Sequence, residues 1–223
     1  ALRQEGVPDS RVHMTGNTSI DALMWTLKKL ESERLFDPGN PPGTPRPFIL
    51  VTAHRRESFG GGMRSIAEAL ATLAGRFPDT DWIFPVHPNP AVRSVMHPAL
   101  AGISNIKLLE PLDYPRFCWL LSRCKLVLTD SGGIQEEAPS LGKPVLVMRE
   151  VTERPEGVSA GATKLVGCSA SRIVEETARL LENGTDLHKM AVCRNLYGDG
   201  CASERIAAAL ALHQDSEEIR DRL

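Results

Sequence analysis

The sequence lacks the features that mark membrane and nucleic-acid-binding proteins. No apolar run approaches the ~20 residues needed to cross a bilayer, and residues 1–10 are polar with mixed charge, unlike a signal peptide. The formal net charge is only −2, which makes no electrostatic case for nucleic acid or for an anionic membrane surface. We therefore expect neither nucleic acid nor a membrane as a partner.

Cysteine and histidine also lack the spacing of disulfide or metal sites. The cysteines are odd in number and scattered, with no C-x-x-C pair, which favours buried or incidental thiols in a reducing cytosol over a disulfide framework or a zinc site. No histidine lies in an H-x-x-x-H or H-E-x-x-H pattern. We predict a cytoplasmic protein without a metal ion. The cysteines are Cys118, Cys124, Cys168, Cys193 and Cys201.

What the sequence does contain is a regular alternation of apolar strands and amphipathic helices after residue 47. This alternation predicts β-α-β units, and hence an α/β fold with a parallel sheet that is covered on both faces. The predicted strands are 48–51, 82–86, 106–109, 126–129, 144–148 and 164–166. The predicted helices are 63–76, a short helix from 91, 114–122, 133–141, 171–182 and 203–213, followed by a charged tail at 214–223.

The part before residue 48 is organised differently. Residues 37–47 contain five prolines, which exclude a helix or an inner strand and predict a semi-rigid linker. Ahead of it we predict a strand at Arg11–Thr15 and a helix at Ser19–Arg34, in which Ile20, Leu23, Met24, Leu27 and Leu30 recur at helical spacing. One strand and one helix do not make a domain, so residues 1–36 are interpreted as the end of a preceding domain with a connecting helix.

The most informative segment is Thr129–Ala138, which follows the apolar strand 126–128 and opens a helix. Backbone N–H groups at Ser131, Gly132 and Gly133 would face outward at the positive end of that helix, where a phosphate binds well. Ser131 is equally suited to a plain helix cap. The carboxylates of Glu136 and Glu137 would repel a phosphate directly ahead, so we expect them to point sideways and accept from sugar hydroxyls. This combination suggests a nucleotide or a nucleotide-sugar.

Further polar segments follow other predicted strands, at the edge where parallel sheets bind ligands. His54 and Arg55 follow the first strand. His54 is a candidate acid or base and Arg55 a candidate hydrogen-bond donor to a phosphate, or else both belong to a solvated basic loop. His87 follows the second strand, where either a turn or a ligand contact would explain it. Arg154 follows the fifth strand and is a natural phosphate clamp within a charged run.

The loop after the third strand offers a different chemistry. The backbone of Leu112 can present N–H and C=O groups to a base edge, and Phe117 can stack on a flat ring. Phe117 and Trp119 also fit the spacing of core residues on a helix, and for Trp119 the core interpretation is preferred.

Six motifs along nearly the whole chain occur in the order found in one family. The chain resembles the bacterial non-hydrolysing UDP-N-acetylglucosamine 2-epimerases. The motifs are T-G-N-T-S-I-D-A-L (Thr15–Leu23), T-A-H-R-R-E-S (Thr52–Ser58), P-V-H-P-N-P (Pro85–Pro90), T-D-S-G-G-I-Q-E-E-A-P-S-L-G-K-P (Thr129–Pro144), R-E-V-T-E-R-P-E (Arg149–Glu156) and Y-G-D-G (Tyr197–Gly200). Ser58 stands where many members have Asn.

The resemblance implies a Rossmann-like domain at 48–213, the C-terminal half of a GT-B-type two-domain fold, that binds UDP, UDP-GlcNAc and UDP-ManNAc. It also implies a role for each candidate. His54, Ser131, Gly132, Gly133 and Arg154 would contact the diphosphate, Glu137 the ribose, and Leu112 and Phe117 the uracil, while Arg55, Glu57 and His87 would lie near a second, regulatory nucleotide-sugar site.

The family reaction inverts carbon 2 by eliminating UDP and adding it back, with no nicotinamide or metal cofactor. The resemblance places the carboxylates that act at carbon 2 in the missing N-terminal domain, so we expect His54 to assist the leaving diphosphate and the isolated chain to be inactive. It also implies a homodimer at full length. Two alternatives stay open: the donor-binding domain of a GT-B glycosyltransferase, and a non-catalytic nucleotide-sugar-binding module.

Overall fold

The computed structural model describes residues 2–33, 46–192 and 195–220, with the backbone alone for 213–220. Within these residues, six parallel strands form one sheet in the order β3-β2-β1-β4-β5-β6. The strands are β1 (Phe48–Thr52), β2 (Asp81–Pro85), β3 (Ile106–Leu109), β4 (Leu126–Thr129), β5 (Val145–Val147) and β6 (Thr163–Leu165).

The strand order creates a topological switch point at the carboxyl edge of the sheet. The chain first steps outward from β1 to β2 and β3, then returns to the other side of β1 and steps outward again through β4, β5 and β6. Leu50 therefore pairs with Ile83 on one side and with Val127 on the other. Connections leave β1 and β4 in opposite directions, and such a switch point is where open α/β sheets bind their ligands.

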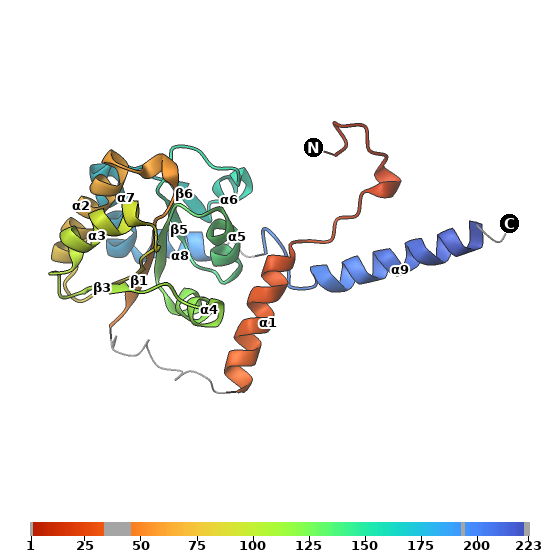
Figure 1. Cartoon of the computed structure of the whole chain (residues 1–223), viewed down its shortest axis with the longest axis horizontal. Helices are drawn as coiled ribbons and strands as arrows, with labels where there is room; N and C mark the ends of the chain where they lie inside the picture. Colours follow the sequence, from red (N-terminus) through yellow and green to blue (C-terminus); the bar gives the residue numbers. More distant parts are fainter. Residues whose placement is uncertain (1, 34–45, 193–194, 221–223) are drawn as a thin grey trace.

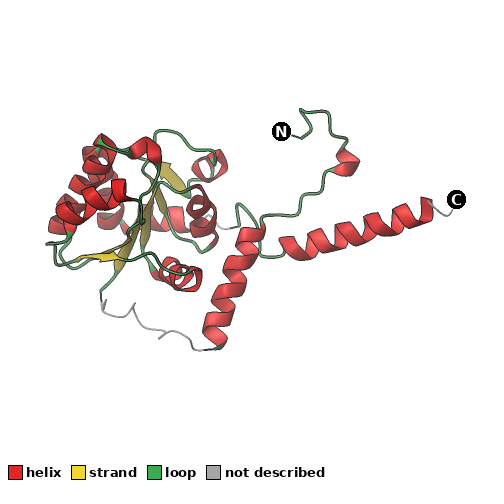
Figure 2. Ribbon diagram, in the orientation of Figure 1, coloured by secondary structure: helices red, strands yellow, loops and turns green. Residues whose placement is uncertain are grey.

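Helices cover both faces of the sheet, which explains why whole strands are apolar (Figures 1 and 2). Ile49 and Val51 face one side and Phe48 and Leu50 the other, and all four are buried. The first side packs against α2 (Gly61–Arg76), α3 (Pro90–Leu100), α7 (Ala170–Glu182) and α8 (Gly184–Ala191). The second packs against α1 (Thr18–Ser32), α4 (Tyr114–Arg123) and α5 (Gly132–Ser140).

The elements predicted after residue 47 are confirmed, with ends shifted by at most two residues except at the end of the last helix, but two short helices were missed. These are α6 (Pro155–Ser159) and α8, which begins after the capping residue Asn183. Helix α6 has only five residues and starts inside a charged run. A segment of this length carries too little periodicity to be recognised from sequence.

The predicted strand at Arg11–Thr15 is wrong. A single 3₁₀ turn, η1 (Asp9–Arg11), follows Pro8, and residues 12–17 have no regular structure. His13 and Met14 are exposed in this segment. A strand needs a partner for its backbone groups, and residues 11–15 pair with no strand of the described sheet, which runs from β3 at one edge to β6 at the other.

The amino- and carboxyl-terminal helices contact each other. The carboxylate of Asp21 on α1 accepts from the backbone N–H of Ala202 at 3.0 Å and of Ser203 at 2.6 Å, at the start of α9 (Ala202–Arg220). Helix α9 continues past His213, where we had expected it to end, and projects away from the sheet in Figure 1. Of the linker predicted at 37–47, residues 37–45 lie outside the described residues. No helix in the described ranges is long and apolar enough to cross a membrane.

Candidate functional site

Asp130, the residue directly after β4, ties the two loops of the switch point together. Its carboxylate is fully buried, and Oδ2 accepts from the backbone N–H groups of His54 and Arg55, both at 2.7 Å. Oδ1 lies 3.2 Å from His54 Nδ1. The loop after β1 is therefore held against the start of α5, and the contact at Nδ1 leaves His54 Nε2 for a ligand.

A pair of threonines strengthens the same junction. The hydroxyl oxygens of Thr52 and Thr129, at the ends of β1 and β4, are 2.6 Å apart and buried. Thr129 Oγ1 also accepts from the backbone N–H of Ser131 at 3.0 Å. The buried hydroxyl groups at the strand ends therefore find hydrogen-bond partners within the protein.

The start of α5 presents donors at the switch point. Ser131 is the N-cap residue but its side chain makes no capping bond, and Gly132 and Gly133 are the first two residues of the helix. The N–H groups of a helix's first turn have no acceptor within the helix. The Arg55 Nη2 atom lies 3.5 Å from where a Gly132 Cβ would be. Backbone donors and a guanidinium thus converge on one spot, which suits an anion.

His87, from the loop after β2, completes this group. Its ring stacks on that of His54, with centroids 5.4 Å apart and an interplanar angle of 17°. His54 is therefore flanked by His87 on one side and by Asp130 on the other. Side chains from the ends of β1, β2 and β4 meet here.

A second group lies where α4 and α5 approach each other. Glu137 accepts from the Tyr114 hydroxyl at 3.2 Å. Burial raises the pKa of Glu137 above its usual value, although the Tyr114 hydrogen bond acts in the opposite direction. Leu112 and Phe117 are half-buried and pack against the core on this face, while Trp119 is a core residue as predicted.

Arg154 belongs to a third group that reaches the amino-terminal segment. Its Nε donates to Glu136 Oε1, and its Nη1 donates to the Glu153 carbonyl at 3.1 Å. Asn17 Nδ2 donates to the other Glu136 oxygen at 2.5 Å. Asn17, Glu136 and Arg154 line an open pocket of about 550 Å³ together with Tyr197. Glu136 is therefore a bridge between elements, and nothing in the sequence indicated this pairing.

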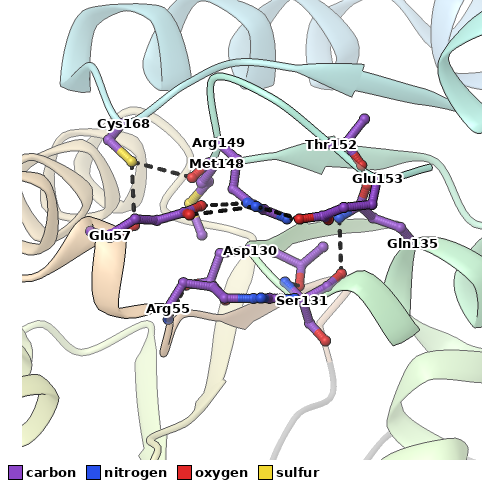
Figure 3. Close-up of polar contacts among 12 residues, drawn as sticks. Arg55, Glu57, Asp130, Ser131, Gln135, Met148, Arg149, Thr152, Glu153 and Cys168 are labelled. Atoms are coloured by element: carbon purple, nitrogen blue, oxygen red, sulfur yellow. Dashed lines mark hydrogen bonds and ion pairs between the residues drawn. The ribbon is translucent and has the colours of Figure 1, made fainter. Parts of the chain in front are cut away.

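Arg149 forms a further cluster, shown in Figure 3. It follows β5, is 4% exposed, and donates to the carboxylates of both Glu57 and Glu153. These hydrogen bonds raise the pKa of Arg149, and those to Glu153 lower the pKa of that carboxyl group to about 2. Among the described residues there is no group of three or more His, Cys, Asp or Glu side chains that could hold a metal ion.

Comparison with known families identifies the lineage of this site. The family model for UDP-N-acetylglucosamine 2-epimerase matches residues 1–211. The chain belongs to this family. It is 49% identical to the UDP-N-acetylglucosamine 2-epimerase of Escherichia coli K12 over 220 residues, and 48% identical to that of Yersinia pestis over 218. These alignments cover 94% and 96% of this chain but only 57% and 58% of the relatives, so the chain spans somewhat over half of their length.

Solved structures agree with this assignment. The UDP-GlcNAc 2-epimerase of Neisseria meningitidis bound to UDP-GlcNAc is 43% identical with a TM-score of 0.88, covering 94% of this chain and 58% of that one. The S. aureus MnaA–UDP co-structure is 40% identical with a TM-score of 0.87, covering 96% and 57%. Anabaena HepE in complex with UDP and glucose, at 17% identity and a TM-score of 0.59, shares the fold alone. The predicted Rossmann-like half of a GT-B-type fold is confirmed.

In this epimerase-family chain the predicted site residues separate into neighbouring clusters. Arg55 was expected at a second site, but its guanidinium lies beside Gly132 at the α5 start. Glu57, also expected there, is bonded to Arg149. Sequence reasoning gave no role to Asp130 or Arg149; a charged residue directly after a strand that is apolar up to its last residue is the signal that could have drawn attention to Asp130.

Proposed function

We propose that this chain is the UDP-binding portion of a UDP-GlcNAc 2-epimerase, which interconverts UDP-GlcNAc and UDP-ManNAc. The observation that carries the proposal is the cluster of Asp130, His54, Arg55 and the α5 start at the switch point, in a chain that belongs to this family. The intact enzyme would act in the cytoplasm as a homodimer.

The diphosphate would bind at the start of α5. Ser131, Gly132 and Gly133 offer donors there, and His54 is held with Nε2 available. Arg154 would assist from the neighbouring loop, where Glu136 now fixes its guanidinium. Ribose hydroxyls would donate to Glu137, and Leu112 and Phe117 would frame the uracil.

The reaction would break the bond between carbon 1 of the sugar and the UDP oxygen while the carbon 2 proton is removed. That proton is weakly acidic, so its removal must be accompanied by departure of a well-stabilised diphosphate. Donors already fixed at the α5 start, together with His54, would stabilise the negative charge that develops on UDP. In the addition step the bond between carbon 1 and the UDP oxygen would re-form while carbon 2 takes a proton on its opposite face, and the same donors would hold the UDP.

The groups that act at carbon 2 would come from outside this chain, so the chain alone would bind UDP without turnover. Arg55, Glu57 and His87 would also border a regulatory nucleotide-sugar site. Because Arg55 already lies beside Gly132, that second site would adjoin the diphosphate site.

Two measurements on the chain test this function: UDP affinity by titration calorimetry, and conversion of UDP-GlcNAc followed by NMR. We expect UDP binding without conversion. His54→Ala should weaken UDP binding by about tenfold, the value of one charge-assisted hydrogen bond. His188→Ala, an exposed histidine on α8, should leave affinity unchanged. Absence of UDP binding, or efficient conversion by the chain alone, would contradict the proposal.

A further inference from the structure

Arg149 is a buried cation shared between two half-exposed carboxylates (Figure 3). Its Nε donates to Glu57 Oε1 at 2.5 Å, and Nη2 lies 3.4 Å from Glu57 Oε2. Nη1 and Nη2 donate to the two oxygens of Glu153 at 2.8 and 3.0 Å. The Arg149 side chain is 3% exposed, against 50% for Glu57 and 57% for Glu153. Both forks of the guanidinium are thus occupied.

These contacts join loops that do not neighbour each other in the sheet. Glu57 lies in η2 (Arg56–Ser58), after β1, and Glu153 lies in the loop after β5. The strand order places β4 between β1 and β5, so the start of α5 emerges between the two loops. Arg149 therefore links the loops that carry Arg55 and Arg154, on either side of the proposed diphosphate site.

Arg55 is the cation near the proposed diphosphate site that a free carboxylate could pair with. Among the described residues its guanidinium makes no hydrogen bond or ion pair, and it lies beside Gly132. The positive charge of Arg55 already acts on Glu153. Hydrogen bonds from Arg149 are the main cause of the lowered pKa of Glu153, and the charge of Arg55 lowers it further. A Glu153 released by Arg149 would have Arg55 as an alternative partner, besides its neighbour Arg154.

We propose that Arg149 is a positioning residue that keeps Glu57 and Glu153 away from Arg55, so that the Arg55 guanidinium stays available for the diphosphate of UDP at the start of α5. This inference rests on the proposed function. Without Arg149, two carboxylates would stand ionised beside the anion site, because both are exposed enough to keep their charge. Glu153 would pair with Arg55 and would also repel the incoming diphosphate.

A suppressor experiment tests this role by measuring UDP affinity with calorimetry. Arg149→Met should weaken UDP binding by about tenfold, the loss of one charge-assisted contact. Adding Glu153→Gln to Arg149→Met should restore part of that loss, because the Glu153 carboxylate then no longer competes for Arg55 and only that of Glu57 remains free. Glu153→Gln alone should change affinity little. Recovery on removing a further contact is not expected if Arg149 merely stabilises the loops.

The matched control is Arg76→Met, which breaks a surface pair between Arg76 and Glu182 (2.7 Å) that joins α2 and α7. Its UDP affinity should equal that of the wild type. If Arg149→Met fails to fold by circular dichroism, Arg149→Lys replaces it, and Glu153→Gln should again improve binding in that background.

The outcomes separate this inference from the function on which it rests. A wild-type chain that does not bind UDP contradicts the proposed function. A wild type that binds UDP while folded Arg149→Met binds it equally well overturns the role of Arg149 alone. A loss in Arg149→Met that Glu153→Gln does not reduce overturns it too.

Discussion

Asp130 and Glu137 are two carboxylates of the same strand–helix unit with opposite surroundings. Asp130 is fully buried; its Oδ2 accepts two backbone N–H bonds of 2.7 Å, and its Oδ1 lies 3.2 Å from His54 Nδ1. Glu137 has a single longer bond, from Tyr114 at 3.2 Å, and burial raises its pKa. An under-satisfied carboxylate that is partly withdrawn from water is suited to accept from a ligand, because the ligand supplies the missing donors.

The raised pKa of Glu137 predicts that its charge lowers the stability of the fold while it favours ligand binding. Ionisation of this group opposes folding: the penalty is absent below the unfolded-state pKa and complete once the pH exceeds the raised folded-state pKa. Glu137→Gln should therefore raise the urea midpoint at pH 7, and the gain should vanish toward pH 4 and below. The same variant should bind UDP more weakly.

Glu175→Gln, an exposed position on α7, is the control and should shift neither the urea midpoint nor the affinity. A Glu137→Gln variant that is less stable than the wild type at pH 7 would contradict this account.

Helix α5 is short and starts with two glycines, a poor choice for helix stability. Gly133 is exposed, and a Cβ placed there would meet nothing within 4 Å. Packing therefore does not require a glycine at this position. Helix propensity does not favour one either, because Ala is favoured over Gly in a helix by up to about 1 kcal/mol. The use of glycine is explained if a ligand must approach the N–H groups closely.

Gly133→Ala is therefore expected to raise the free energy of unfolding by up to about 1 kcal/mol and to weaken UDP binding. The matched control is Gly184→Ala, at the first residue of α8, where a Cβ also meets nothing within 4 Å. It should stabilise the chain similarly and leave UDP affinity unchanged. Equal affinities for the two variants would show that the α5 start is not the phosphate site.

At the level of the whole molecule, apolar packing and hydrogen bonds to carboxylates connect α1 to the sheet domain and α9 to α1. Helix α1 packs Leu23 and Leu30 into the core over α4 and α5, and Asn17 at its start reaches Glu136 on α5. Asp21 on α1 then serves as the capping carboxylate of α9, across the whole length of the chain. The hydrogen bond from the Ser203 backbone lowers the pKa of Asp21.

This long-range cap makes a prediction about pH. Because the folded-state pKa of Asp21 is lowered, its contribution to stability is present above the unfolded-state pKa and is lost as the pH falls through the folded-state pKa. Asp21→Ala should lower the melting temperature at pH 7 and reduce the helical circular dichroism signal. The difference from the wild type should shrink as the pH falls below about 4. Asp79→Ala, an exposed aspartate, should have no effect at either pH.

The sequence by itself determined the parallel sheet, the boundaries of most strands and helices, and the family. Buried parallel strands such as β1 and β4 are continuous apolar runs, and the helices between them have a regular periodicity, so both are encoded locally. The start of α5 could also be predicted, because a strand followed by Ser131 and two glycines is a local pattern. The strand prediction for residues 11–15 was wrong for the complementary reason: a strand depends on a pairing partner, which the local sequence does not specify.

Only the tertiary structure decided how the charged residues pair. The partners of Asp130 lie 75 and 76 positions away, Arg149 and Glu57 are 92 positions apart, and Asn17 reaches Glu136 over 119. Such pairs depend on the strand order β1-β4-β5, which brings remote loops to one edge of the sheet. A charge run in a sequence shows how many carboxylates and guanidinium groups are present, but the fold determines which of them pair with one another and which, like Arg55, make no ion pair within the described residues.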